Sequence, residues 1–126
     1  MKRYTTFAGA IAAVLFATAA QAHPKLVTSS PAANAVVASP TVVELHFSEA
    51  LVGQFSGIDL AMTDMPGMKM KAPMKMAEVK AVVGPDGKTL AAKMARPLSA
   101  GTYKLDYHVV SKDTHRIAGT YTFKVK

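Results

Sequence analysis

Six of the eight methionines lie within fifteen residues, from Met62 to Met76. The thioether sulfur of methionine is a soft and polarisable donor, and several together favour a soft cation such as Cu(I). Two prolines and a glycine interrupt any helix here, and three lysines alternate with the sulfurs, so burial in a core is disfavoured. The segment therefore predicts a metal-binding loop. The alternative is a packing segment, because Met62, Met65 and Met68 have the spacing of a buried helix face.

Residues 1–22 have the order of a secretory signal peptide. A basic start is followed by an apolar run over residues 7–20 and by Ala-Gln-Ala, a typical cleavage sequence that ends at Ala22. The apolar run is too short to predict a membrane span. We therefore expect a soluble, exported domain over residues 23–126, located in the periplasm of a Gram-negative bacterium.

Cleavage after Ala22 would make His23 the first residue of the mature chain. Its free α-amine and its imidazole Nδ1 could then chelate one metal ion, and Cu(II) favours nitrogen and oxygen donors in a planar arrangement. A second imidazole would supply a third nitrogen, and His115 is the candidate because it lies in a short turn between two expected strands. Asp113 can reach the same side. The alternatives are a cleavage site that happens to precede a histidine, and a polar turn in which Asp113 caps backbone N–H groups.

Three further polar side chains need an interpretation. Glu49 ends an expected strand, where it is either a surface acid or a hydrogen-bond acceptor for the N-terminal amine. His46 and His108 are expected to face solvent or a polar sheet edge, and neither is assigned to a metal.

Charge and cysteine content exclude several classes of site. The chain has 15 Lys and Arg against 8 Asp and Glu, and removal of Lys2 and Arg3 lowers the net charge from +7 to about +5. No arginine-rich run or exposed aromatic ladder accompanies this charge, so nucleic-acid binding is not expected. With no cysteine, the exported chain has neither a disulfide nor a thiolate ligand. Any copper site must use nitrogen, carboxylate or thioether donors.

The apolar residues that would position these donors alternate with polar ones, with a period of two. This pattern covers residues 42–49, 58–62, 103–109 and 121–125 and is typical of strands with one buried face. Residues 77–83 and 89–94 flank a turn-rich connection and predict a hairpin.

Tyr103 follows a Gly-Thr pair at the start of a strand. This arrangement resembles the corner of a Greek-key sandwich, in which a tyrosine hydroxyl bonds back to the upstream backbone. With about seven short strands and almost no helical periodicity, the sequence predicts an all-β fold, a single immunoglobulin-like Greek-key β-sandwich.

Six short segments, in order, resemble the CopC (PcoC) family of periplasmic copper-resistance proteins. They are His-Pro-Lys-Leu-Val at 23–27, Glu-Leu-His-Phe-Ser-Glu at 44–49, Gln-Phe-Ser-Gly at 54–57, Met-Pro-Gly-Met at 65–68, Ala-Gly-Thr-Tyr at 100–103 and Asp-Thr-His at 113–115. The resemblance spans nearly all of residues 23–126. It implies a small β-sandwich that carries copper at two separated sites.

The resemblance also implies which residues bind each ion. The Cu(II) site would fall on His23, Asp113 and His115, with Glu49 as a weak ligand or hydrogen-bond partner. The Cu(I) site would use thioether donors from Met65, Met68, Met70, Met74 and Met76. Family members commonly place a histidine among these methionines, whereas this segment has none, so an all-thioether Cu(I) site is implied.

The resulting hypothesis is a non-enzymatic copper carrier for copper resistance or homeostasis. The resemblance implies that it hands copper to an inner-membrane transporter of the CopD type, and we expect it to act as a monomer. One alternative is a copper-dependent enzyme, since monooxygenases that cleave polysaccharides also hold copper through an N-terminal histidine. The small size and the absence of tryptophan argue against a flat polysaccharide-binding surface. The other alternative is a structural β-sandwich module that binds no metal.

Overall fold

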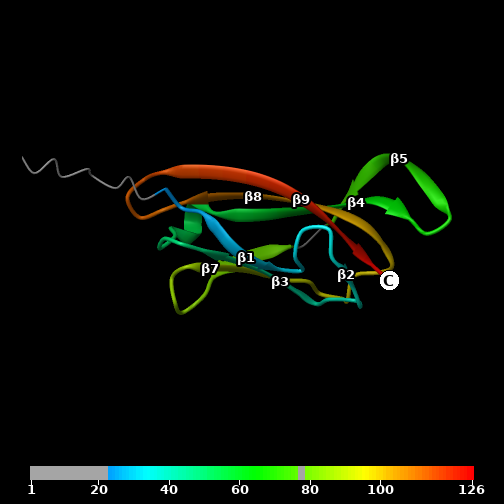
Figure 1. The fold of residues 1–126 in the computed structure, drawn as a ribbon, viewed down its shortest axis with the longest axis horizontal. Coiled ribbons are helices and arrows are strands. Elements are labelled where there is room, and N and C mark those ends of the chain that lie inside the picture. Colours follow the sequence, from blue (N-terminus) through cyan, green and yellow to red (C-terminus); the bar gives the residue numbers. More distant parts are fainter. Residues whose placement is uncertain (1–22, 77–78) are drawn as a thin grey trace, which may run out of the picture.

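The computed structural model describes residues 23–76 and 79–126, which form two packed β-sheets (Figure 1). Nine strands make up the two layers: β1 (Leu26–Ser30), β2 (Val36–Val37), β3 (Val42–Phe47), β4 (Gly57–Met65), β5 (Met68–Lys75), β6 (Lys80–Val83), β7 (Thr89–Lys93), β8 (Gly101–Val110) and β9 (Arg116–Val125). Within the described ranges the one helical element is a single 3-10 turn, η1 (Gly53–Phe55). These ranges contain no helix long and apolar enough to cross a membrane. The predicted all-β sandwich is confirmed.

The first sheet has the strand order β1-β3-β7-β6, with every pair antiparallel. Its central strand β3 shows why the alternating pattern gives this structure. Val43, Leu45 and Phe47 are buried, while the intervening Glu44 and His46 are half-exposed on the outer face. The polar residues of β3 therefore lie on the solvent-facing side of the sandwich.

The second sheet has the order β2-β9-β8-β4-β5. The long β8–β9 hairpin forms its centre and pairs in continuous register from Gly101 opposite Val125 to Val110 opposite Arg116. Inward-facing side chains of both sheets, including Leu105, meet in a single buried cluster. This rigid hairpin fixes the turn that carries Asp113 and His115.

The corner at the start of β8 has the predicted hydrogen bond. The hydroxyl of Tyr103, a fully buried residue, donates to the backbone carbonyl of Ser99 at 2.7 Å. The Tyr103 ring stacks on Phe123 with centroids 5.6 Å apart. The hydroxyl is therefore satisfied in the core while the ring adds to the packing between β8 and β9.

The methionine segment is neither the predicted loop nor the alternative, a packing segment with helical spacing. It forms the hairpin β4–β5, in which a two-residue turn joins Met65 to its partner Met68. Gly67 has φ +74°, a conformation that glycine adopts without strain, so the Pro-Gly pair makes this turn. Pro73 is tolerated because β5 is an edge strand, where a missing N–H need not break a ladder.

Other boundaries also differ from the sequence predictions. The structure has nine strands among the described residues rather than about seven, because β5 and the two-residue β2 gave no alternating pattern. The predicted strand at 77–83 begins at Lys80, with residues 77 and 78 outside the described part, and it pairs with β7 as expected. The predicted signal peptide, residues 1–22, also lies outside the described residues.

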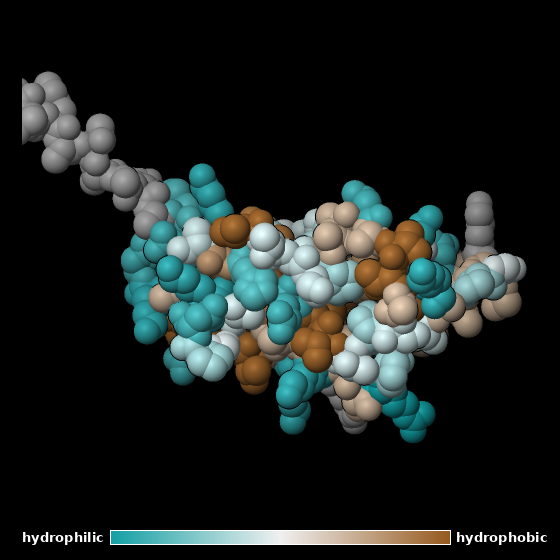
Figure 2. All heavy atoms as spheres, turned by 60° about the horizontal axis from the view of Figure 1, so that its bottom comes forward, coloured by the Kyte–Doolittle hydropathy of each residue, from teal (hydrophilic) through white to brown (hydrophobic). Residues whose placement is uncertain are grey.

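The two donor sets lie at opposite ends of the sandwich. In Figure 1 the β4–β5 hairpin projects from one end, while the β8–β9 turn and the start of β1 lie at the other. The face drawn in Figure 2 shows hydrophobic side chains in separate patches among hydrophilic ones, rather than as one continuous apolar surface.

Candidate metal centre

The turn between β8 and β9 is held by its own backbone and by one buried serine. The N–H of Ser111 donates to the carbonyl of His115 at 2.9 Å, and the N–H of Thr114 donates to the carbonyl of Ser111 at 2.9 Å. Ser111 is 1% exposed, and its hydroxyl donates to Oδ1 of Asp113. The turn thus presents Asp113 and His115 in a fixed conformation.

Asp113 orients the imidazole of His115. Its Oδ2 lies 3.0 Å from Nδ1 of His115, and an ionised carboxylate only accepts hydrogen bonds, so Nδ1 is the donor. The hydrogen bonds from Ser111 and then from His115 hold the pKa of Asp113 below its ordinary value. In the neutral imidazole this leaves the lone pair on Nε2, the atom available to a metal ion.

His23 lies against His115, with ring centroids 4.6 Å apart and an angle of 59° between the rings. Its neighbour Pro24 is fully buried, and the next residue is held by two hydrogen bonds to Ser48, directly after β3. The N–H of Lys25 donates to the hydroxyl of Ser48, and the N–H of Ser48 donates to the carbonyl of Lys25, each at 2.9 Å. These contacts bring the predicted N-terminal histidine to the turn.

The other parts of the predicted Cu(II) site are not assembled. Glu49 is half-buried after β3, and within residues 23–76 and 79–126 no three His, Asp or Glu side chains converge closely enough to hold a metal ion. The nitrogen of His23 is a peptide nitrogen in the uncleaved chain, so an amine donor exists there only after cleavage. The structure therefore shows two pairwise contacts, His23 with His115 and His115 with Asp113, and the three side chains do not converge on one point.

The predicted Cu(I) donors differ in their exposure. Met65, Met68 and Met74 are 40%, 64% and 51% exposed. Met70 and Met76 are half-buried and pack against the core cluster. The hairpin therefore presents three sulfurs to solvent and keeps two against the sandwich.

The charge around these sulfurs is partly balanced. Nζ of Lys75 lies 3.8 Å from Oδ1 of Asp59 on the neighbouring strand, and both side chains are largely exposed. Such an exposed pair contributes little stability. It does place a carboxylate beside one of the three lysines in the methionine segment.

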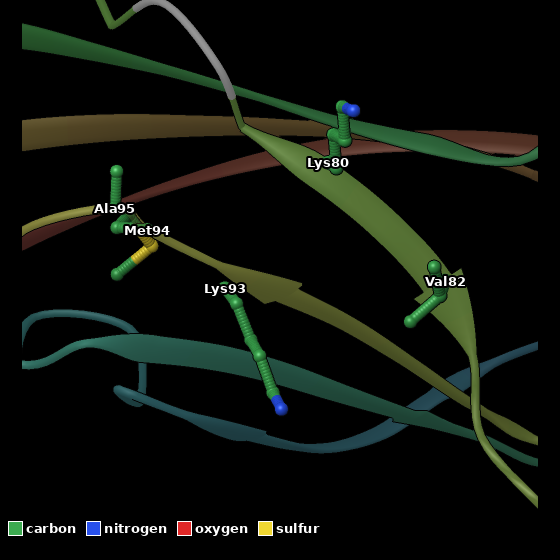
Figure 3. Close-up of a pocket in the computed structure, with 5 residues that line it drawn as sticks. All are labelled: Lys80, Val82, Lys93, Met94 and Ala95. Atoms are coloured by element: carbon green, nitrogen blue, oxygen red, sulfur yellow. The ribbon is translucent and has the colours of Figure 1, made fainter.

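A separate hollow of about 560 Å³ lies over β6 and β7 (Figure 3). Its lining consists of Lys80, Val82, Lys93, Met94 and Ala95. One thioether and two ammonium groups give a cation no anionic or imidazole donor. This hollow does not extend either predicted site.

Sequence reasoning missed the role of Ser111. The signal was a serine directly after the apolar pair Val109-Val110, at a position where the strand is still buried. A buried hydroxyl needs a partner, and here the partner is the carboxylate that orients His115.

The chain is similar to known proteins in sequence and in structure. The model of the CopC domain family matches residues 26–126, which include both sheets and the β8–β9 turn. The chain belongs to the CopC family. Copper resistance protein C of Pseudomonas syringae pv. tomato is 56% identical over 117 residues, covering 91% of this chain and 90% of the relative.

Solved structures agree with the assignment to CopC. The crystal structure of selenomethionine PcoC, a copper resistance protein from Escherichia coli, matches with a TM-score of 0.76 and 46% identity, over 81% of this chain and 99% of PcoC. A second crystal structure, of PcoC described as a methionine-rich copper resistance protein, matches with a TM-score of 0.74 and 46% identity, over 83% of this chain and all of PcoC.

The predicted family and the immunoglobulin-like β-sandwich are therefore confirmed. None of these CopC and PcoC relatives is named as an enzyme, in agreement with the non-enzymatic interpretation.

Proposed function

We propose that this CopC-family chain is a periplasmic copper carrier for copper resistance, with a Cu(II) site at His23 and His115. The observation that supports it best is the approach of the two imidazoles to 4.6 Å between ring centroids, with one ring oriented by Asp113. Imidazole nitrogens are donors that Cu(II) favours. The relatives named copper resistance protein C supply the identity of the cargo.

Processing would complete the Cu(II) site. Cleavage after Ala22 releases the α-amine of His23, which with Nδ1 of the same residue forms a chelate. Nε2 of His115 supplies the third nitrogen, because Nδ1 is engaged by Asp113. The carboxylate of Asp113 or of Glu49 is left as a weak ligand or as a hydrogen-bond partner of the amine.

The methionine hairpin is the proposed Cu(I) site. Met65, Met68 and Met74 are exposed enough to reach one soft ion, with Met70 and Met76 joining it if the hairpin moves away from the core. Donor softness then separates the two oxidation states. Oxygen and nitrogen donors hold Cu(II) at one end of the sandwich, and thioethers hold Cu(I) at the other.

The carrier acts as a monomer and gives its copper to an inner-membrane transporter of the CopD type. An open hairpin that projects from the domain suits this transfer, since a partner can replace exposed thioethers one at a time (Figure 1).

The test is a Cu(II) titration followed by electron paramagnetic resonance on residues 23–126, beside a variant with one extra alanine before His23. The native start should bind one Cu(II) with nitrogen hyperfine structure, and the extended variant should bind at least about tenfold more weakly. Equal binding by the two proteins would show that the α-amine of His23 is not a copper ligand. In a parallel Cu(I) competition, replacement of Met65, Met68 and Met74 by leucine should weaken binding, and an unchanged affinity would exclude the hairpin site.

A further inference from the structure

The outer face of the four-stranded sheet carries a second imidazole that is oriented by a chain of hydrogen bonds. His46 on β3 lies directly opposite Thr89 on β7, and their side chains Nδ1 and Oγ1 are 2.9 Å apart. Oγ1 of Thr89 in turn donates to Oδ2 of Asp86 at 2.7 Å. The three residues come from a strand, its neighbour and the turn before that neighbour.

The turn fixes the carboxylate at the end of this chain. Oδ1 of Asp86 accepts the backbone N–H groups of Lys88 at 3.0 Å and Thr89 at 2.9 Å. The hydrogen bond from the Thr89 hydroxyl is the largest cause that holds the pKa of Asp86 below its ordinary value. The carboxylate therefore stays ionised and accepts the single hydroxyl proton of Thr89.

These contacts determine the tautomer of His46. Because Thr89 gives its proton to Asp86, its oxygen can only accept from Nδ1 of His46. The neutral imidazole then carries its lone pair on Nε2. That atom lies 3.4 Å from Oε2 of Glu44, so two electron-rich atoms lie next to each other.

A cation bound between the two atoms would remove the repulsion between them. A metal ion about 2.0–2.1 Å from each donor spans a separation of about 3.3 Å at a tetrahedral angle and about 2.9 Å at a right angle. The observed 3.4 Å needs only a small rotation of two side chains that are 41% and 47% exposed. Glu44 and Asp86 also place two negative charges beside the ring, on a chain with net positive charge.

We propose that His46 Nε2 and Glu44 Oε2 form a separate surface site for a divalent ion that favours imidazole and carboxylate ligands, Cu(II) or Zn(II). Thr89 and Asp86 act as positioning residues that hold the ring with Nε2 outward, as partners beyond the metal ligands commonly do. The site has two protein donors, and its other coordination positions are open to water. It does not use the N-terminal amine, so it does not depend on the carrier proposal.

The experiment starts from residues 23–126 already holding one equivalent of Cu(II). A second equivalent is added either as Cu(II), with binding followed by electron paramagnetic resonance, or as Zn(II), with binding followed by the imidazole 15N resonances. We expect Zn(II) to shift the 15N resonance of Nε2 of His46. We expect His46→Gln or Glu44→Gln to weaken binding of the second ion at least about tenfold. Thr89→Val should weaken it several-fold, because the ring loses its orientation but both donors remain.

His108→Gln is the matched control, because it removes an exposed histidine on the other sheet. It should leave the second affinity unchanged. Equal binding of the second ion by the wild-type chain and His46→Gln would overturn the site. So would a His46 Nε2 that stays protonated with Zn(II) in excess, because the pair with Glu44 is then an ordinary ion pair.

The chain with an extra alanine before His23 separates the two proposals. It should lose the first Cu(II) and keep the ion at His46. Loss of both ions together would contradict an independent site.

Discussion

The imidazole ring centroids of His23 and His115 lie 4.6 Å apart, although the two residues lie next to strands of different sheets. His23 precedes β1 of the four-stranded sheet, and His115 precedes β9 of the five-stranded sheet. Their contact therefore exists only when the two layers are packed together. A metal ion held by both rings would bind the folded sandwich more tightly than the unfolded chain, and would raise its stability by mass action.

The carboxylate of Asp113 should affect Cu(II) affinity through His115. Asp113→Asn keeps the side-chain shape but removes the charge that accepts the proton of Nδ1, so we expect Cu(II) affinity to fall by about 10- to 100-fold. A competition titration with a Cu(II) chelator measures this loss. Asp106→Asn on β8 is the control, since its carboxylate faces Lys104 instead. An affinity equal to that of the wild type would show that Asp113 does not orient the ring.

Acid should loosen the β8–β9 turn only at low pH. The pKa of Asp113 is lowered in the fold, so its stabilising contribution is present above the pKa of the unfolded chain and is lost as the pH falls through the lower folded value. Copper released at milder acidity must then have a cause other than protonation of Asp113. Carboxyl 13C shifts recorded against pH should place the transition of Asp113 below the ordinary pKa of an aspartate. A transition at or above that ordinary value would contradict the hydrogen bonds from Ser111 and His115.

Two methionines of the hairpin should differ in what they do. Met62 is 4% exposed in the core, so Met62→Ala should lower the free energy of unfolding by about 2–5 kcal/mol. Met68 is 64% exposed, and Met68→Ala should change it by less than about 0.5 kcal/mol while weakening Cu(I) binding. Urea unfolding of the metal-free protein measures both values. Equal destabilisation would mean that the exposed sulfur packs in solution.

The hydroxyl of Tyr103 should contribute measurably to stability. Tyr103→Phe leaves the ring on Phe123 but removes the donor to the Ser99 carbonyl, so the free energy of unfolding should fall by about 1–3 kcal/mol. Tyr107→Phe is the matched control on the same strand, where the hydroxyl lies over Gly119. We expect that change to alter stability by less than about 0.5 kcal/mol. A similar fall in the free energy of unfolding of the two variants would contradict a stabilising role for the Tyr103 hydrogen bond.

The strands with regular alternation could be predicted from the sequence. In β3, β8 and β9, the apolar residues at every second position form the buried face. When one face of a sheet is covered, only one register of the strand places all of these residues in the core. The strand β5 could not be predicted in this way. Its residues are methionine, lysine, alanine and proline, which have little strand preference, and pairing with β4 determines its conformation.

The candidate sites were predicted to different extents. His23 and His115 could be paired from chemistry, since an N-terminal chelate needs one more nitrogen, and the structure places their rings in contact. The chain from His46 to Asp86 could not, because Thr89 meets His46 only through the register of β3 with β7. Sequence separation conceals such contacts until the pairing of strands is known.

The hairpin β4–β5 also bears on self-association. An outermost strand offers free N–H and C=O groups to a second chain, and such edges promote fibre formation. In β5, Pro73 lacks one donor, and the ladder to β4 is irregular between Met62 and Asp64. Exposed charges on Lys71 and Lys75 repel a like copy. The strand can thus extend its sulfurs into solvent at high protein concentration without serving as a template for aggregation.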